Sequence, residues 1–396
     1  MNKQDWTYKK LGEVATFSRG LTYSKSDVVV ESSNKVLRSN NIDLATHSLN
    51  FDDIVCLKDK FEIPVDKILQ PNDIFICMSN GSTQHLGKVA FVEKKIDYAF
   101  GGFMGAIHPD TNEIYPKYAY YYCLSSEYRR SLSTVLNGIN INNIKWSDLS
   151  KFPIPVPPIG EQERIVAELD LLSGIIEKKK EQLKAYDQLA QSIFYTMFGD
   201  ISDTAFPIKC LNDVCEFIKD GTHQTPTYTD DKENGVKFLS AKDVVGGTIN
   251  WDNIKYIPID LHKELHKRIA PQRNDILLCK NGTTGICAIV ETDEIFDIYV
   301  SLALLRPRKP NCPKYLLYAI NNPLTKEQFN RSLKGVGVPN LHLGEIKKAR
   351  IIYPPLSLQQ EFAEKVEAIE RQKALVQQSI EETQTMFDYT MDKYFG

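Results

Sequence analysis

Residues 157–199 read PPIGEQERIVAELDLLSGIIEKKKEQLKAYDQLAQSIFYTMFG, and residues 354–396 read PPLSLQQEFAEKVEAIERQKALVQQSIEETQTMFDYTMDKYFG. The two stretches are equally long, and both begin with Pro-Pro and end with Phe-Gly. In the first stretch, apolar residues recur at steps of four and three in turn, which is the heptad pattern of a coiled coil. The second stretch carries a weaker form of this pattern, so each stretch predicts a long helix with an apolar seam.

The predicted helices have marked ends and two possible packing partners. Ser357 with Gln360 predicts a capping box, and Gly199 is typical of a helix stop. Each helix could pack onto its own globular domain, but the regular repetition in both stretches favours a seam shared between them. Lys179 is a charged member of the first seam. The predicted helix–helix seam residues are Ile165, Leu169, Leu172, Ile176, Leu183 and Ile193 in the first helix, and Phe362, Val366, Ile369, Val376, Ile380 and Phe387 in the second.

The two helices end the two halves of an internal duplication. LGEVATF near the start of the chain matches LNDVCEF near the start of the second half, and NDIFIC matches NDILLC. From Pro116, which pairs with Pro313, the two copies stay at a constant offset of 197 residues to their Phe-Gly ends. A register without gaps over this length indicates a true repeat. We therefore divide the chain into a first repeat, residues 1–199, and a second repeat, residues 200–396.

Each repeat has the same predicted order of elements. Short apolar runs separated by Gly and Asn turns indicate strands, and a helical stretch, a Pro-rich exit and the long helix follow. The fold class is therefore α+β, with two similar globular domains at residues 1–158 and 200–355. The long helices occupy residues 159–199 and 356–396. Because paired copies usually close around a two-fold axis, we expect the helices to form an antiparallel coiled coil with pseudo-two-fold symmetry.

Composition excludes several classes of protein and identifies none. None of the eight cysteines forms a CxxC pair, so we expect reduced thiols and no zinc site. The polar start lacks the apolar core of a secretory signal, and no apolar run could span a bilayer, so we expect a cytoplasmic protein. The net charge is −3; the two globular domains carry +1 and +2, and the helices −2 and −4. This charge is too small to identify a nucleic acid as the partner.

The sequence contains no complete catalytic motif. The stretch from Gly81 to Lys88 resembles a phosphate-binding loop, but it has five residues between its glycines and Val after the lysine, whereas that motif needs four and then Ser or Thr. Asp275 and Lys280 have a loosely nuclease-like spacing that the first repeat does not share. No methyltransferase tetrad or metalloprotease His motif is present. We therefore expect a non-enzymatic protein with no catalytic residues and no metal ligands.

The motif order resembles the DNA-specificity subunits of type I restriction–modification systems. The resemblance rests on the openings LGEVATFSRG and LNDVCEFIKDG, the central NDIFICMSNGS and NDILLCKNGTTG, and the helix entries IGEQERIVAELD and LSLQQEFAEKVEAIE. Its most specific element is Pro-Pro followed after three residues by Gln, which occurs in both copies. The resemblance covers essentially the whole chain.

This resemblance implies a function and a set of partners. It implies two target-recognition domains, each of which reads one half of a split DNA site. It also implies that two methyltransferase subunits bind this chain and that restriction and translocase subunits join them. S-adenosylmethionine, ATP and magnesium would be used by those partners, and no cofactor is expected on this chain.

The candidate DNA-reading residues cluster in equivalent loops of the two repeats. They are Arg, Lys, Asn, Gln, Ser, Thr and His, which contact base edges and phosphates, although several of these types also simply build turns. The first loop set comprises Arg19, Lys25, Arg38, Asn40, Asn41, Ser79, Asn80, Ser82, Thr83, Gln84, His85, Lys88, Asn140, Asn142, Asn143 and Lys145. The second loop set comprises Lys219, Thr222, His223, Gln224, Lys242, Lys280, Asn281, Thr283, Thr284, Asn340 and His342.

Two other functions remain open from the sequence. The chain could be the specificity chain of a related, type IIB-like system, which has the same DNA chemistry and a different partner. It could also be a stand-alone DNA-modifying enzyme, although that would require a methyl-donor or nuclease motif. Identification of the bound partner would separate the first alternative from the type I function.

Overall fold

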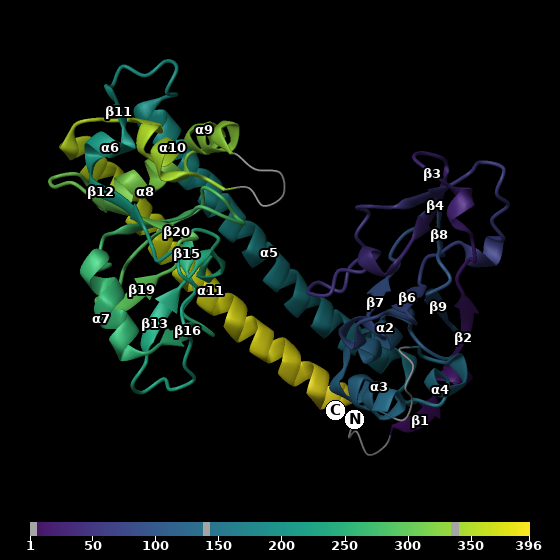
Figure 1. Ribbon diagram of the computed structural model, residues 1–396. Helices are drawn as coiled ribbons and strands as arrows, with labels where there is room; N and C mark the ends of the chain where they lie inside the picture. The colour runs from purple at the N-terminus through teal and green to yellow at the C-terminus, as the bar shows by residue number, and fades with distance from the viewer. Residues whose placement is uncertain (1–5, 138–142, 334–339) are drawn as a thin grey trace. The chain divides into compact units, whose positions relative to one another are not determined.

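The computed structural model describes residues 6–137, 143–333 and 340–396 (Figure 1). The chain divides into two compact units: a first unit formed by Met1–Lys180 and Gln378–Gly396, and a second unit formed by Glu181–Gln377. Each unit holds one globular domain together with part of both long helices. We therefore describe each unit by itself.

The first unit is built on a four-stranded antiparallel sheet in the order β2–β9–β6–β7. Every residue of β6 is buried, because both faces of the sheet are covered. A second sheet has the order β3–β5–β4–β8, in which β4 and β8 run parallel. The strands are β1 (Thr7–Lys10), β2 (Ala15–Arg19), β3 (Val28–Val29), β4 (Asn34–Leu37), β5 (Val55–Leu57), β6 (Ile74–Cys77), β7 (Val89–Phe91), β8 (Tyr98–Phe100), β9 (Met104–Pro109) and β10 (Pro153–Val156).

Helices cover one face of the main sheet and close the first unit. Tyr118 and Tyr122 of α2 are fully buried in the core that this helix forms with the sheet. β1 and β10 form a separate antiparallel pair near the helix entry. The α-helices are α1 (Leu11–Val14), α2 (Pro116–Leu124), α3 (Ser126–Asn137) and α4 (Trp146–Leu149), and the 3-10 turns are η2 (Lys25–Asp27), η3 (Ser39–Asn41), η4 (Val65–Lys67) and η5 (Thr83–His85).

The second unit has the same main sheet, in the order β12–β20–β17–β18. Its second sheet is β16–β13–β19, again with one parallel pair, and β11 pairs with β21. The strands are β11 (Ile208–Cys210), β12 (Cys215–Asp220), β13 (Val236–Leu239), β14 (Val244–Val245), β15 (Thr248–Ile249), β16 (Lys255–Ile257), β17 (Ile276–Cys279), β18 (Cys287–Ile289), β19 (Phe296–Ile298), β20 (Leu302–Pro307) and β21 (Arg350–Ile352). The helices are α6 (Leu211–Val214), η6 (Ala241–Asp243), α7 (Ile259–Arg268), α8 (Pro313–Asn321), α9 (Pro323–Ser332) and α10 (Leu343–Lys348).

The main sheets of the two units match strand for strand, and each second sheet contains one corresponding parallel pair, which is the structural form of the sequence duplication. The second sheets differ at one edge: within the described residues, β3 of the first unit has no counterpart in β16–β13–β19, and the second unit has the additional pair β14–β15. The units differ in the segment before the central strand: the first has the short turn η4, whereas the second has the ten-residue helix α7. The predicted α+β class is confirmed.

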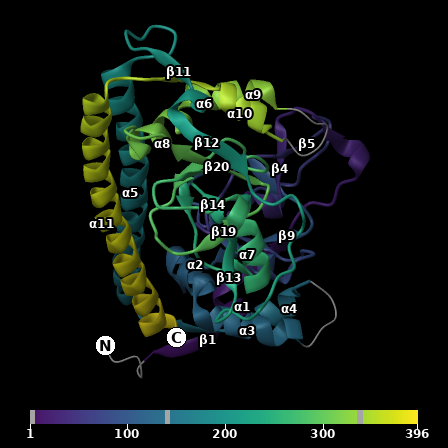
Figure 2. The same ribbon diagram turned by 60° about the vertical axis from the view of Figure 1, so that its left-hand side comes forward.

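The long helices are α5 (Ile159–Phe198) and α11 (Leu356–Phe395), and they pack antiparallel (Figures 1 and 2). In the first unit, Arg164 Nη2 donates to Tyr394 Oη at 3.0 Å, and Lys179 Nζ donates to the Ser379 carbonyl oxygen at 3.1 Å. In the second unit, the ring centroids of Phe194 and Phe362 lie 5.5 Å apart. The partner numbers fall as the first helix advances, which defines the antiparallel direction.

Most of the predicted seam residues are buried. Eight of its twelve apolar members, including Ile165, Leu169, Phe362 and Val366, are buried, and the other four are half-buried. Lys179 belongs to the seam despite its charge, because its ammonium group bonds Ser379 and also reaches Thr383 Oγ1 at 3.1 Å. A polar pair of this kind inside an apolar seam favours one register of the two helices over others.

The Pro-Pro and Gln elements fix the entry of each long helix onto its domain. Gln162 is buried; its Nε2 donates to the Pro157 carbonyl oxygen at 2.8 Å, and its Oε1 accepts from the Tyr115 amide at 2.8 Å. Gln359 makes the equivalent bonds to Pro354 and Cys312, each at 3.0 Å. Each glutamine therefore joins the helix entry to the start of the preceding core helix, α2 or α8.

The predicted capping box at the start of the second long helix is wrong. The helix already begins at Leu356, so Ser357 lies inside its first turn rather than before it. The buried Gln359, and not Gln360, satisfies backbone groups at this end. Ser followed three residues later by Gln forms a capping box only where the serine stands just before the helix, and here the helix starts one residue earlier.

Substitution Gln162→Leu should lower the free energy of unfolding by about 2 kcal/mol. The change leaves the Tyr115 amide and the Pro157 carbonyl buried without partners, and each such group costs about 1–3 kcal/mol. Gln188→Leu is the matched control, because Gln188 is exposed on the same helix. Urea denaturation of both variants measures the difference, and equal stabilities would show that the clamp contributes nothing.

No helix within the described ranges combines the length and the apolar character that a membrane crossing requires. All eight cysteines are free thiols. Burial raises the pKa of Cys123 and of Cys215 to about 12, so both thiols stay protonated and behave as small apolar side chains.

Candidate nucleic-acid interface

Backbone pairing brings three segments of the first loop set together. Ser79 forms an isolated antiparallel bridge with Asn143, which places the 79–88 loop beside the segment that ends at Lys145. Asn80 Nδ2 donates to Ser39 Oγ at 2.9 Å and so ties the same loop to the turn η3. Two of these segments follow the strands β4 and β6, and the third precedes α4, yet they gather at one edge of the first unit.

Backbone pairing also brings together the segments of the second loop set. Asn281 bridges Asn340, and the Leu341 amide donates to the Lys280 carbonyl oxygen at 2.9 Å. Thr222 bridges Tyr299, which brings the 219–225 segment to the same edge. The two loop sets are therefore equivalent in position within their own units, as the sequence repeat predicts.

Exposure divides the predicted DNA-reading residues into three groups. Asn140 and Asn142 lie outside the described residues. The exposed side chains are Arg19, Lys25, Asn40, Ser82, Thr83, Gln84, Lys145, Lys219, His223, Gln224, Lys242, Thr283 and His342. The half-buried ones are Arg38, Ser79, Asn80, His85, Asn143, Thr222, Asn281, Thr284 and Asn340, and the buried ones are Asn41, Lys88 and Lys280. DNA contact by any of these residues stays a prediction.

Asn41 and Lys88 hold the first loop set in shape. Asn41 is fully buried, and its Nδ2 donates to the carbonyl oxygens of Asn50 and Asp52, both at 2.9 Å. Lys88 is 3% exposed, and its Nζ donates to the Ile42 carbonyl oxygen at 2.9 Å. Burial lowers the pKa of Lys88. Both residues are predicted from the sequence to read DNA because they belong to clusters of polar residues in loops. Their burial and hydrogen bonds support a role in positioning the loops.

Lys280 has a comparable role in the second loop set, through an ion pair that the sequence did not reveal. Its Nζ lies 2.8 Å from Asp220 Oδ2, and both side chains are almost fully buried. Arg268 approaches the other carboxylate oxygen at 3.1 Å, and His223 Nε2 lies 3.2 Å from Oδ2. Burial alone would raise the pKa of Asp220, but the bonds from Lys280 and His223 outweigh it and hold the pKa below its ordinary value. This buried pair fixes the loop that carries Thr222 and Gln224.

The repeats diverge at the residues that shape the two loop sets. Arg19 in the first repeat and Asp220 in the second occupy equivalent positions in the main sheet. Arg19 pairs with Gly105, and Asp220 pairs with Ala303. The buried residue after the central strand is Met78 in the first repeat and Lys280 in the second. The first repeat therefore has the exposed Arg19 and the apolar Met78 where the second has the buried ion pair of Asp220 and Lys280. The two loop sets differ in charge as a result.

Two arrangements that resemble catalytic sites have structural explanations. Asp275 pairs with Arg306 at 2.8 Å rather than with Lys280, which removes the nuclease-like pair. In the first unit, Ser18 Oγ lies 2.8 Å from His108 Nε2, and His108 Nδ1 lies 2.6 Å from Asp73 Oδ1. Oδ2 of each aspartate accepts a backbone amide of the preceding turn, at 2.7 Å for Asp73 and 2.8 Å for Asp275. Since the aspartate anchors the same turn in both units, we interpret both arrangements as structural.

A separate hollow lies elsewhere in the first unit. It is an open groove of about 820 Å³ between the loop at residues 45–51, α2 and the adjoining parts of the long helices. Its lining includes Tyr120, Lys117 and Asp170 together with Phe387 of α11. None of the first loop set lines it, so it is separate from the candidate DNA interface.

The family model and the relatives that match this chain all describe type I restriction specificity proteins. Residues 3–185 and 205–384 match the family model described as the type I restriction modification DNA specificity domain. The chain is 24% identical to the EcoKI specificity subunit of Escherichia coli strain K12, over 92% of this chain and 82% of that protein. It is 32% identical to the StySPI specificity subunit of Salmonella potsdam, over 47% of this chain and 40% of that one.

Two solved structures share the fold along their whole length. One is a chain from work on the complex assembly and conformational transition of the type I R-M system, with 18% identity, a TM-score of 0.58 and coverage of 98% of this chain and 97% of that one. The other is the S subunit of a type I restriction–modification system from M. genitalium, with 15% identity, a TM-score of 0.53 and coverage of 99% and 96%. At these identities the likeness shows the fold alone.

Proposed function

The chain belongs to the family of type I restriction–modification DNA specificity proteins, and from this premise we propose that it reads a bipartite double-stranded DNA target, one half with each loop set. Specificity subunits of this family are non-catalytic, which confirms on family grounds that this chain is not an enzyme. DNA recognition is therefore its activity, and the division of the target into two halves is our proposal.

The proposal rests on one observation: the two units share a main sheet but carry different loop sets. The four-stranded main sheets of the two units have the same strand order, whereas the loop sets differ in side chains and in charge. Exposed groups such as Gln84 and Gln224 can form paired hydrogen bonds with a base edge in the major groove. Two different reading edges on one chain suit a target made of two different half-sequences.

We further propose that the chain works only as part of a larger assembly in the cytoplasm. Two methyltransferase subunits would bind it, and restriction and translocase subunits would join through them. S-adenosylmethionine, ATP and magnesium would act on those partner subunits. The near-neutral charge of the globular domains supports this division of labour, because neutralisation of phosphates supplies most of the non-specific affinity of DNA-binding proteins.

The isolated chain should therefore bind DNA weakly, and a methyltransferase partner should raise both its affinity and its selectivity. Fluorescence anisotropy at one fixed salt concentration, with and without the partner, measures both quantities. A steeper dependence of binding on salt is expected for the complex, because more phosphates are contacted. Tight and selective binding by the chain alone would contradict the proposed role of the partner.

A type IIB-like assembly is the second candidate and differs only in the partner. Affinity purification of the tagged chain from its native cells distinguishes the two candidates. Separate methyltransferase and translocase subunits support the type I assembly, and a single fused methyltransferase–nuclease polypeptide supports the alternative.

A further inference from the structure

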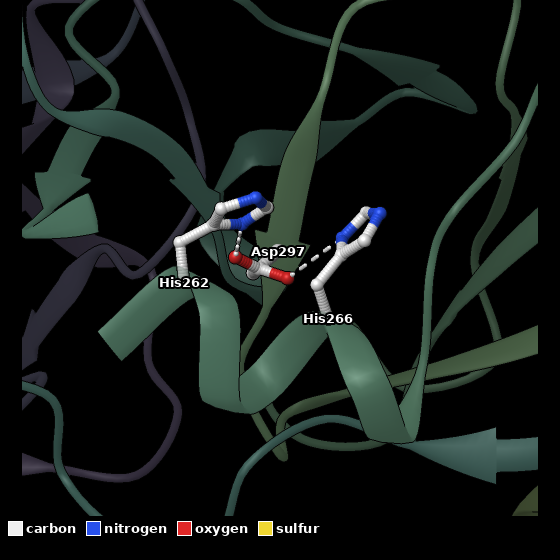
Figure 3. Close-up of side chains that lie close together, drawn as sticks. All are labelled: His262, His266 and Asp297. Atoms are coloured by element: carbon white, nitrogen blue, oxygen red, sulfur yellow. Dashed lines mark hydrogen bonds and ion pairs between the residues drawn. The ribbon is translucent and has the colours of Figure 1, made fainter. Parts of the chain in front are cut away.

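Two histidines of α7 converge on one buried aspartate of the second unit. His262 and His266 lie four residues apart on the helix, and Asp297 lies on the neighbouring strand β19. His262 Nδ1 is 2.7 Å from Asp297 Oδ2, and His266 Nδ1 is 3.4 Å from Oδ1. Figure 3 shows both rings on one side of the helix with these nitrogens turned toward the carboxylate.

We propose that His262, His266 and Asp297 form a binding site for zinc or a similar divalent transition-metal ion. The candidate ligand atoms of the three residues all lie within 4.8 Å of one another. Histidines four residues apart on one helix face are a common zinc-binding arrangement, and a carboxylate is a suitable third ligand. The inference concerns this chain alone and does not depend on the proposed function.

The measured separations suit coordination. Two ligands bound at about 2.0–2.1 Å in a tetrahedral site lie about 3.4 Å apart. His266 and Asp297 are already at that separation, and His262 would have to move away from the carboxylate by about 0.7 Å. The exposed fractions of the side chains are 12% for His262, 31% for His266 and 2% for Asp297, so the site opens on the His266 side. A water molecule can supply the fourth ligand there.

The packing of α7 gives the metal a structural role. None of the ten residues of this helix is buried, although all ten are described. Its described side chains are at most half-buried, so polar contacts, namely those of the two histidines with Asp297 and of Arg268 with Asp220, contribute to its attachment to the second unit. A metal bound by residues of both elements would strengthen the attachment of α7 to β19.

The ligand set also predicts which ions bind. Imidazole nitrogen favours zinc, cobalt(II) and nickel(II), whereas calcium and magnesium prefer sites made of oxygen ligands. The site is therefore distinct in chemistry from the magnesium proposed for the partner subunits. All eight cysteines lie outside this cluster, so variants of the histidines leave every thiol in place.

The test uses the full chain after treatment with a chelator, followed by equilibrium dialysis against zinc. The wild type should retain about one zinc ion per chain, and cobalt(II) should give the visible absorption bands of a tetrahedral site. With zinc in about hundredfold excess over its Kd, the melting temperature should rise by about 5 °C or more. Magnesium should have none of these effects.

The variant His262→Asn/His266→Asn should lose the zinc, the cobalt spectrum and the thermal shift. Asparagine keeps an N–H donor near Asp297, so the variant should fold, and His266→Asn alone provides a milder second variant at a partly exposed position. His108→Asn is the matched control, because it removes one histidine from a His–Asp pair in the first unit. Equal zinc binding by the wild type and the double variant, or no binding by either, would overturn the proposal.

Discussion

Insertion of two residues after Lys179 should abolish the antiparallel pairing over one half of the long helices. Two residues rotate everything that follows by about 200° around the helix axis, so the apolar face on one side of the insertion turns toward solvent. Several seam residues, among them Leu183 and Ile193, would then lose their partners. Since burial of one such side chain is worth about 1.5–3 kcal/mol, the loss should reach at least about 5 kcal/mol.

A seven-residue insertion is the matched control for this prediction. Placed after Lys179 in α5 and at the facing level near Ser379 in α11, it keeps the heptads in phase. This variant should keep its thermal stability and its partner. Seven residues add about 10 Å of helix, which corresponds to about three base pairs of B-DNA. We therefore expect the unspecified spacer of the target to lengthen by about three base pairs while both half-sequences stay unchanged.

Thermal melting and methylation of a DNA library with variable spacers measure the two outcomes. Equal stability of the two-residue variant and the wild type would show that the seam does not hold the helices together. An unchanged spacer in an active seven-residue variant would show that partner subunits, rather than α5 and α11, set the distance between the half-sites.

Substitution Lys280→Met should lower the free energy of unfolding by about 3 kcal/mol at neutral pH. Removal of one member of a buried ion pair usually costs about 3–5 kcal/mol, because the other charge is left in a poor solvent. Asp220 keeps Arg268 and His223 as partners, which places the expected loss at the lower end. Methionine is the residue that the first repeat has at this place, so the side chain should fit.

The pH dependence of this loss follows from Asp220. Its pKa in the folded chain is below its ordinary value, so the ion pair stabilises the fold above about pH 4 and loses this effect as the pH falls through the folded pKa. The difference between wild type and Lys280→Met should therefore shrink in acid. The exposed Lys242→Met is the control and should change stability by less than about 0.5 kcal/mol.

A double substitution separates the pair from its surroundings. The double variant Asp220→Asn/Lys280→Met should lose less free energy of unfolding than the sum of the losses in the two single variants. Each single variant leaves one buried charge without its partner, whereas the double variant removes both charges. Strict additivity in urea denaturation would show that the two charges do not interact.

The long helices and the repeat could be predicted from the sequence because both depend on local periodicity. The seam positions follow from steps of four and three, and eight of the twelve predicted residues are buried. The pairing of β4 with β8, and its counterpart in the second unit, could not be predicted in this way. These strands are far apart in the chain, and their apolar runs carry no signal of which neighbour they select.

The candidate interface was predictable as two sets of loops but not residue by residue. Lys88 and Lys280 are polar residues beside strands, and only the folded chain shows that both are buried. The buried role of Gln162 was equally hidden, although its motif was visible. His262 and His266 had the spacing of metal ligands in the sequence, and the missing part of the pattern was Asp297, which comes from another element.

Methylation of a randomised DNA library by the chain with its methyltransferase partner tests the central claim most directly. The wild type should yield one motif with two fixed half-sequences and a spacer of constant length. Gln84→Ala should relax preference in one half and Thr283→Ala in the other, each by about 1–3 kcal/mol at the affected base pair. A contiguous motif, or a variant that alters both halves equally, would contradict the assignment of one half-site to each loop set.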